Sequence, residues 1–265
     1  MLLLHSLNAN GLRTCGKMTA ILEGIKGDIL CLQETRWDKN SVEAATNIWN
    51  GNIFHNNGTI KSSGVATLIK NNNINDSKLV HKDNNGRLLI IDITVNNIIY
   101  RIINVYANNC EKERKEMFNK IGRWVNNKTV IVGDFNTVLT KSDISVNNVY
   151  KNDISRTALY ELMNNHNLMD IWRIQNPLKR TFSRRQVVKG TLRQSRIDLC
   201  LRGSRTSVFF LLPLVHSPSL FHYHLTFPCI LCLFICLDHS PRQFYCSGEA
   251  YLSFFFSCFP DGFNR

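Results

Sequence analysis

The stretch Thr129-Val-Ile-Val-Gly-Asp-Phe-Asn-Thr137 (TVIVGDFNT) carries the clearest structural signal in this chain. Its first four residues form a short apolar run rich in Val and Ile, which predicts a buried β-strand over 129–132. Gly133 interrupts the run, and Asp134 and Asn136 follow at once. A buried strand therefore ends in a carboxylate and an amide, two groups that can bind a metal ion or fix a phosphate.

Similar apolar runs, bounded by Asn, Gly or Asp, occur along the first three quarters of the chain. They predict six further strands, at 2–7, 28–32, 64–69, 87–95, 98–106 and 195–201. Asn96 and Asn97 separate two of these runs and suit a tight hairpin, because Asn tolerates the left-handed backbone conformation that such turns require. The sequence thus predicts mixed sheets that contain antiparallel pairs.

Two segments have helical spacing instead. One begins at Glu111 and places Met117, Phe118 and Ile121 on one face, and the other begins at Ser155, a candidate N-cap, and places Leu159 and Leu162 on one face. Helices are therefore expected between the strands, as in an α/β fold.

Polar side chains follow several of the predicted strands and should gather at one rim of the fold. Phosphodiester hydrolysis needs such a set: carboxylates for a hard cation, a general base for water, and amides that hold the phosphate. Taken singly, Glu34 could be a surface residue, Asp134 a helix N-cap, Tyr106 a half-buried aromatic residue and Asp198 a turn residue. Their order and spacing together favour the catalytic interpretation.

Seven motifs carry a resemblance to a known family. They are Leu-Asn-Ala-Asn-Gly-Leu (7–12), Leu-Gln-Glu-Thr (32–35), Ser-Gly-Val-Ala (63–66), Asn-Val-Tyr-Ala (104–107), Gly-Asp-Phe-Asn-Thr (133–137), Asp-Ile-Trp-Arg (170–173) and Ser-Arg-Ile-Asp (195–198). From about Leu2 to Leu201 the chain resembles the endonuclease/exonuclease/phosphatase superfamily, and most of all the apurinic-type endonuclease domain of LINE (non-LTR) retrotransposons. The resemblance implies a four-layer α/β sandwich, with two packed mixed sheets flanked by helices, and a divalent metal, Mg²⁺ (or Mn²⁺).

The resemblance also implies a role for individual residues. Metal binding is implied for Asn10, Glu34 and Asp238, and catalytic roles for Asn8, Tyr106, Asp134, Asn136, Asp198 and His239. Among these, Asp134 matches the residue that orients or deprotonates water, Asp198 the carboxylate that orients the catalytic histidine, and Tyr106 the tyrosine at the phosphate. Thr181 matches a hydroxyl that lines the site.

A basic run without acidic residues precedes the last of these motifs. Between Asp170 and Asp198 the chain has eight basic residues and no acid, and Arg184–Arg193 suggests a hairpin with Gly190 near its turn. The alternative, a solvated charged surface, is the usual interpretation of such a run. Because acids are interspersed elsewhere, we expect DNA phosphates to be contacted here, by Arg184, Arg185, Lys189, Arg193 and Arg196.

The composition changes near residue 203. From Ser204 onward only six of 62 residues are charged, and 11 of the 15 Phe and five of the nine Cys lie there. We therefore divide the chain into an endonuclease-like domain, 1–203, and an aberrant segment, 204–265, which holds the Asp238-His239 pair but has Leu237 where the family has Ser. We expect no well-packed strand after about Gly203, apart from local order around Asp238 and His239.

Two other interpretations of this segment receive little weight. Pro and His residues interrupt Val208–Leu237, which leaves too short an apolar run for a membrane span. Cys229, Cys232, Cys236 and His239 have approximate zinc-ligand spacing, but no second pair accompanies them.

The net charge of +12 favours a polyanionic partner, which we expect to be double-stranded DNA. Scattered cysteines and the lack of a secretory signal predict free thiols and an intracellular protein, nuclear or cytoplasmic, without membrane attachment or a stable protein partner. The expected function is metal-dependent nicking of DNA to leave a 3′-hydroxyl, by a protein derived from a LINE-type retrotransposon. The alternatives are a phosphatase or phosphodiesterase of the same superfamily and a catalytically dead DNA-binding relic.

Overall fold

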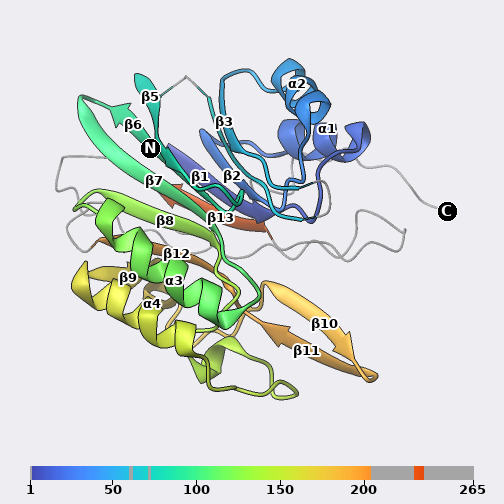
Figure 1. Cartoon of the computed structure of the whole chain (residues 1–265), viewed down its shortest axis with the longest axis vertical. Helices are drawn as coiled ribbons and strands as arrows, with labels where there is room; N and C mark the ends of the chain where they lie inside the picture. The colour runs from blue at the N-terminus through green and yellow to red at the C-terminus, as the bar shows by residue number, and fades with distance from the viewer. Residues whose placement is uncertain (1, 60–61, 71–72, 204–229, 236–265) are drawn as a thin grey trace, which may run out of the picture.

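Two β-sheets packed against each other form the centre of the protein (Figure 1). The computed structural model describes residues 2–59, 62–70, 73–203 and 230–235. The first sheet has the order β13-β1-β2-β4-β3, with β1 at Leu2–Asn8, β2 at Ile29–Gln33, β3 at Asn52–Asn56, β4 at Val65–Ile69 and β13 at Ile230–Ile235. The second has the order β5-β6-β7-β8-β12-β9, with β5 at Asp76–Lys82, β6 at Leu88–Val95, β7 at Ile98–Tyr106, β8 at Thr129–Asp134, β9 at Leu168–Asp170 and β12 at Asp198–Gly203.

Both sheets are mixed, as predicted. Strands β1 and β2 run parallel, as do β7 and β8, and the other neighbouring strands are antiparallel. A separate two-stranded hairpin projects from the sandwich and consists of β10 at Arg184–Val188 and β11 at Thr191–Ser195 (Figure 1). The hairpin expected around Gly190 is therefore confirmed.

Alternating apolar residues give each sheet two buried faces. In β8, Val130 and Val132 belong to the core between the sheets, whereas Ile131 belongs to the core beneath the helices. The same alternation in β2 sends Cys31 inward and Leu30 toward the helices on the other side. Because successive side chains of a strand point to opposite faces, short runs of Ile, Val and Leu are buried on both sides.

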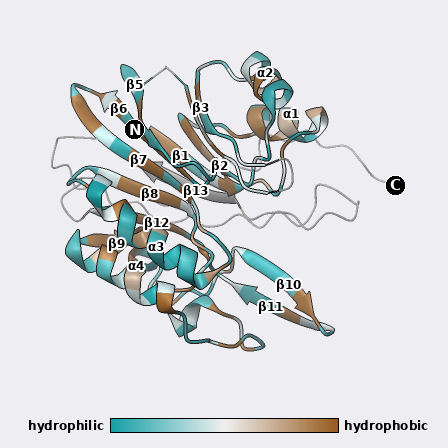
Figure 2. Cartoon of the chain, in the orientation of Figure 1, coloured by the Kyte–Doolittle hydropathy of each residue, from teal (hydrophilic) through white to brown (hydrophobic). Residues whose placement is uncertain are grey.

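Helices cover the two outer faces. Helices α1 (Cys15–Gly24) and α2 (Lys39–Ile48) pack on the first sheet, and α3 (Glu111–Ile121) and α4 (Ile154–Asn165) pack on the second (Figure 1). This is the four-layer α/β sandwich that the sequence resemblance implied. Figure 2 shows the strands β8 and β12 largely hydrophobic and the projecting hairpin mostly hydrophilic. In the part of the chain that the structure describes, no helix is long and apolar enough to span a bilayer.

Several local predictions are confirmed and others need correction. Asn96 and Asn97 have φ angles of 50° and 63° and form the hairpin turn between β6 and β7. The strand predicted over 195–201 is divided, because Ser195 ends β11 and β12 begins only at Asp198. The N-cap of α4 is Asp153 rather than Ser155; the Asp153 carboxylate accepts a hydrogen bond from the Ser155 backbone N–H.

Some elements were not predicted from the sequence. They are α1, α2, β3, β5, β9, the short helix α5 (Ile171–Gln175) and two 3₁₀ turns at Gly122–Trp124 and Lys141–Asp143. Helix α1 has no side-chain cap and no acidic residue in its first turn, and β5 is a largely exposed edge strand, so both lack the usual sequence signals.

A strand forms in the segment after Gly203, where we expected no well-packed strand. Ile230–Ile235 pairs with β1 in an antiparallel register from Leu2↔Ile235 to Leu7↔Ile230. Because a run rich in Ile and Leu can pair with a free strand edge, this segment covers the outer edge of β1 despite its unusual composition. The division of the chain at residue 203 remains a prediction.

Candidate active site

The ends of four strands and the start of a fifth meet at one rim of the sandwich. Tyr106 at the end of β7 lies opposite Asp134 at the end of β8, and Asp134 lies opposite Asp198 at the start of β12. In the first sheet, Asn8 ends β1 and Glu34 follows β2. Strand register thus brings together side chains that are up to 190 residues apart, as the sequence predicted.

The amide of Asn8 connects the two sheets at this rim. Its Nδ2 donates to Glu34 Oε1 at 3.0 Å and to Asp134 Oδ2 at 2.9 Å. The other oxygen of Asp134 accepts the backbone N–H of Asn136 at 2.9 Å, and the Asn136 side chain donates to the carbonyl of Ala107 at 2.8 Å. The carboxylate of Asp134 is therefore held in one orientation by donors on both sides.

Asp134 and Asp198 form a buried pair of carboxyl groups that are 4% and 7% exposed. Burial and the nearby charge of Glu34 raise the pKa of Asp134 to about 6, although hydrogen bonds from Asn8 and Asn136 work in the opposite direction. Burial and the neighbouring Asp134 raise the pKa of Asp198 well above its usual value, against a hydrogen bond from Ser183. Because both carboxyl groups are buried at paired positions of neighbouring strands, a negative charge on one opposes ionisation of the other.

Tyr106 completes the second-sheet side of the site. Burial and the Glu34 carboxylate raise the pKa of its phenol, which also donates a hydrogen bond to Glu34. The guanidinium of Arg87 lies 4.8 Å from the centre of its ring. The phenol therefore keeps its proton and can donate it to an oxygen in the site.

Glu34 and Asn10 present oxygen atoms on the first-sheet side. Burial opposes the charge on Glu34, but hydrogen bonds from Asn8, Arg36 and Tyr106 outweigh it and lower its pKa. Both Glu34 Oε2 and Asn10 Oδ1 accept hydrogen bonds from Nη2 of Arg36, at 2.8 and 2.9 Å. An ionised carboxylate beside an amide oxygen is the donor set that Mg²⁺ or Mn²⁺ takes, so these residues fit a hard divalent cation.

The described residues do not complete a metal-binding cluster. No group of three His, Cys, Asp or Glu side chains converges within them. Asp238 and His239, for which the resemblance implied metal-binding and catalytic roles, lie outside the described residues, as do the zinc-spaced residues Cys229, Cys236 and His239. These roles remain predictions.

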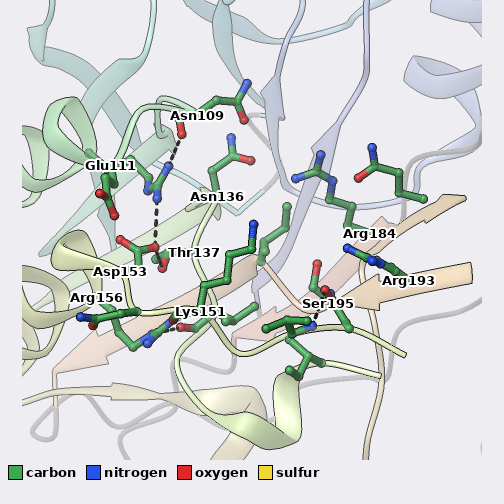
Figure 3. A pocket seen from close by; sticks show the side chains of 18 of the residues that line it. Asn109, Glu111, Asn136, Thr137, Lys151, Asp153, Arg156, Arg184, Arg193 and Ser195 are labelled. Carbon is green, nitrogen blue, oxygen red and sulfur yellow. Dashed lines mark hydrogen bonds and ion pairs between the residues drawn. The ribbon is translucent and has the colours of Figure 1, made fainter. Parts of the chain in front are cut away.

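A cationic pocket opens beside Asn136 (Figure 3). Its volume is about 420 Å³, and it lies between the hairpin and the loop that follows β8. The hairpin contributes Arg184 and Arg193, and Lys151 extends into the pocket from the loop (Figure 3). Among the described residues, none of these three cations forms an ion pair with a carboxylate. The pocket can therefore neutralise the charge of an anion next to the buried carboxyl pair.

The hairpin distributes its predicted DNA-binding residues over two faces and a turn. Arg184, Gln186 and Val188 line the pocket, so the alternation of the strand places Arg185 on the other face. Lys189, with φ 49°, is exposed in the turn. The charge of Arg184 is close enough to lower the pKa values of Asp134 and Asp198 against the effect of burial.

Arg196 was expected to contact DNA, and this prediction is wrong. Its side chain is 1% exposed and donates to Asp143 Oδ1 at 2.8 Å and to Asp170 Oδ2 at 2.5 Å. Arg173, from the same basic run, pairs with Asp143 at 2.6 Å. The run has no acid of its own, but the fold brings Asp143 and Asp170 to it from outside the run.

Four residues that bear on the site were not predicted from the sequence. Arg36 follows Glu34 by two positions, Lys151 enters the pocket, Asp143 anchors Arg196, and the Ser183 hydroxyl accepts the backbone N–H groups of Ile197 and Asp198. A basic residue directly after the Leu-Gln-Glu-Thr motif was the only available signal for Arg36. Thr181, predicted to line the site, is 9% exposed, and its role remains a prediction.

Comparisons with known proteins agree with this geometry. The Endonuclease/Exonuclease/phosphatase family matches residues 5–220. The uncharacterized 149 kDa protein of transposon TX1 from Xenopus laevis is 32% identical over 204 residues, which are 74% of this chain but only 15% of that protein.

Solved structures share the fold. The endonuclease domain of TRAS1, a telomere-specific non-LTR retrotransposon, superimposes with a TM-score of 0.62 at 11% identity, over 88% of this chain and 98% of that one. The 3′ phosphatase NExo from Neisseria, bound to a product DNA hairpin, superimposes with a TM-score of 0.69 at 19% identity, over 90% of this chain and 100% of that one.

Proposed function

Because the chain belongs to the endonuclease/exonuclease/phosphatase family, we propose that it is a metal-dependent endonuclease that hydrolyses a phosphodiester bond of double-stranded DNA and leaves a 3′-hydroxyl. The expected family is confirmed, and the similarity to a transposon protein agrees with the LINE-type branch of the resemblance. One observation carries the proposal: the buried carboxylate of Asp134 accepts hydrogen bonds from Asn8, which also donates to Glu34, and from Asn136, which lines the cationic pocket.

Asp134 is the group that fits the activation of water. Asn8 and the Asn136 N–H hold its carboxylate, and its pKa of about 6 leaves it mostly ionised at neutral pH. A general base works best when its pKa lies close to the working pH, because it is then both ionised and basic enough to take a proton. Burial and the neighbouring Asp134 raise the pKa of Asp198, so the two carboxyl groups oppose each other's ionisation beside the reacting phosphate.

Glu34 and Asn10 would hold the divalent cation. When bound there, the cation would polarise the phosphoryl oxygen and offset the charge that develops on it. The Tyr106 hydroxyl and the Asn8 amide lie at the same rim and can donate to the other phosphoryl oxygens. The chain thereby supplies fixed donors for the phosphate in addition to the cationic pocket.

The pocket favours DNA over a small phosphate ester. The pocket has a volume of about 420 Å³, and Lys151, Arg184 and Arg193 line it, so positive charge is available beyond the rim itself. A single phosphate monoester would need only the rim, whereas a DNA strand carries further phosphates on either side of the scissile one. We therefore expect the strand next to the scissile bond to run along Arg184 and Lys151.

The test is nicking of supercoiled plasmid by the full chain in the presence of Mg²⁺. Glu34→Ala and Asp134→Ala should each slow nicking by at least ~10²-fold, because each removes a preorganised group at the reacting phosphate. Glu43→Ala, which removes an exposed carboxylate of α2, serves as the matched control and should nick at the parent rate. If Asp134→Ala nicks as fast as the parent, the site assignment is wrong.

The product and an alternative substrate separate the candidate activities. A DNA polymerase should extend the nick directly, without prior phosphatase treatment, if the product carries a 3′-hydroxyl. An oligonucleotide with a 3′-phosphate, offered in parallel, tests the phosphatase alternative. DNA binding without turnover of either substrate would identify the catalytically dead relic.

A further inference from the structure

Arg36 holds a distinctive position, because one of its nitrogen atoms donates to both oxygens that fit a divalent cation. Nη2 lies 2.8 Å from Glu34 Oε2 and 2.9 Å from Asn10 Oδ1. The side chains of Arg36 and Glu34 are 31% and 19% exposed, so the contact lies at the opening of the site rather than in the core. The guanidinium thus neutralises the oxygen pair in the way that a metal ion would.

The backbone around this contact is tightly constrained. Asn10, Glu34 and Arg36 all have left-handed φ angles, of 44°, 51° and 53°. Backbone hydrogen bonds join the segments that contain Asn10 and Arg36. The N–H of Gly11 donates to the carbonyl of Glu34 at 2.7 Å, and the N–H of Leu12 donates to the carbonyl of Thr35 at 2.9 Å. Non-glycine residues in this conformation are costly and persist only where the surrounding structure holds them. The guanidinium therefore meets the oxygen pair through a fixed backbone and not through a chance surface contact.

The Arg36 side chain also packs across Gly11. A Cβ atom placed on Gly11 would lie 3.5 Å from Cδ and from Nη1 of Arg36. A second cation lies close by, because Lys17 Nζ donates to the carbonyls of Ala9 and Gly11 at 2.6 and 2.9 Å. Burial, together with the charge of Arg36, lowers the pKa of Lys17. Positive charge is therefore already concentrated where a divalent cation would have to bind.

We propose that Arg36 is a resident counter-cation that competes with the divalent cation for Glu34 and Asn10, so that its guanidinium must withdraw from these oxygens when the cation binds. The proposal rests on the proposed function only in placing the cation at this pair. Mg²⁺ approaches its oxygen ligands to about 2.0–2.1 Å, which is closer than the guanidinium approaches them, so both cannot occupy the gap between the two oxygens. Arg36 consequently weakens the binding of the free cation and keeps the ionised Glu34 compensated until the cation arrives.

The experiment measures the binding of Mn²⁺ alone, without DNA, to the full chain, by the electron paramagnetic resonance signal of free Mn²⁺. Arg36→Met keeps the aliphatic stem over Gly11 and removes the charge. Its affinity for Mn²⁺ should rise on the order of tenfold, because a unit charge no longer repels the ion at close range. Arg36→Lys keeps the charge but cannot reach both oxygens, so it should raise the affinity by about two- to threefold.

Two controls make the result specific. Arg13→Met removes an arginine of the same segment that pairs with Asp38 instead, and it should leave Mn²⁺ affinity unchanged. In a Glu34→Gln background, the gain in Mn²⁺ affinity from Arg36→Met should be smaller than in the parent protein, because the guanidinium then has no Glu34 carboxylate to compete for. Thermal unfolding of each variant shows whether it folds, and Arg36→Lys carries the test if Arg36→Met does not.

Unchanged or weaker Mn²⁺ binding by the folded Arg36 variants would overturn the proposal, as would the absence of Mn²⁺ binding in all the proteins. Because the measurement contains no DNA, its outcome is separate from that of the proposed function. A parent protein that nicks plasmid while Arg36→Met binds Mn²⁺ no more tightly would overturn this inference alone. A protein that shows the affinity gain but nicks no DNA would contradict the proposed function alone.

Discussion

Two groups of charged side chains adjoin each other on the chain, one around Arg196 and one around Asp198, yet their charges are balanced very differently. In the first group, Arg173 and Arg196 pair with Asp143 and Asp170 at 2.5–2.8 Å, and every charge has a partner. In the second, the carboxyl groups of Asp134 and Asp198 lie opposite each other on neighbouring strands. Within the described part of the chain, neither of these two carboxyl groups forms an ion pair.

The pKa values follow this difference. Burial opposes ionisation of Asp143, but Arg196 and Arg173 outweigh burial and lower its pKa. Burial acts against ionisation of Asp134 and Asp198, and so does a nearby carboxylate, Glu34 for Asp134 and Asp134 for Asp198, so the pKa values of both rise. The first group, which we call the balanced group, also contains Trp172. The centre of its ring lies 4.9 Å from the guanidinium groups of Arg173 and Arg196.

The comparison indicates a division of labour within one region of the fold. The balanced group joins the loop after β8 to the strand that begins at Asp198, since the Arg196 N–H also donates to the carbonyl of Asp143 at 2.8 Å. The second group, Asp134 and Asp198, which we call the unbalanced group, lowers the stability of the fold. It also provides the Asp134 carboxylate, whose raised pKa suits proton transfer. Sites of this kind commonly sacrifice stability for activity, and the following three predictions test whether that holds here.

The greatest change in stability should come from breaking the balanced group. Arg196→Met leaves Asp170 without an ion-pair partner and Asp143 with Arg173 as its one remaining ion-pair partner among the described residues, so the free energy of unfolding should fall by about 3–5 kcal/mol. Urea denaturation measures this change. Arg185→Met, on the exposed hairpin, is the control and should change the unfolding free energy by less than about 0.5 kcal/mol. A reduction below about 1 kcal/mol for Arg196→Met would show that the group is not a structural anchor.

Removing a carboxylate from the unbalanced group should raise the free energy of unfolding, by less than the loss of Arg196 lowers it. The pKa of Asp134 is raised from 3.8 to about 6 on folding. The folded state therefore binds more protons between these values, and this residue's contribution to stability falls as the pH rises from about 4 to 6. Above pH 6 the cost is complete, so Asp134→Asn should stabilise the protein by up to about 3 kcal/mol at about pH 8 and abolish nicking.

Chelator-treated protein should be used for this measurement, so that no bound cation offsets the carboxylate charge. The matched variant is Asp143→Asn, which removes a carboxylate whose pKa is lowered and should destabilise the protein at about pH 8. Below about pH 4, the gain from Asp134→Asn should disappear, because the parent carboxyl group is then protonated in both states. If Asp134→Asn and Asp143→Asn both lower the free energy of unfolding at about pH 8, the two groups do not differ in the way that we propose.

The smallest effect is expected for the hairpin, whose charged side chains are exposed, and it concerns the free energy of DNA binding. Replacing Arg184, Arg185 and Lys189 together by Ala should flatten the dependence of DNA affinity on salt. The slope of log affinity against log salt should decrease by about 0.9 for each phosphate that the variant no longer neutralises. Lys112, Lys115 and Lys120 of α3, replaced together by Ala, remove the same charge away from the hairpin and serve as the control. Equal slopes for the two triple variants would assign the hairpin to ordinary solvated surface.

Much of the fold could be predicted because its signals are local. Apolar runs such as Ile98–Tyr106 are long enough to identify strands, and the polar residues that end them mark the rim. Elements without such signals could not be found in this way, including α1 with its uncapped start and Ile230–Ile235 in a segment of unusual composition. Their formation depends on a partner, which for Ile230–Ile235 is the edge of β1.

Strand periodicity was enough to predict mixed sheets and the polar rim, and the short motifs carried a family resemblance that implied the family, the sandwich and the roles of the rim residues. How each charge is used became visible only in the folded protein. Arg184 and Arg196 look alike in the basic run, yet one lines an open pocket and the other is buried between two aspartates. Glu34 is recognisable from its motif, but the guanidinium that Arg36 places on it is not. The reason is physical: the energy of a charge depends on its burial and on partners that folding brings from distant parts of the chain.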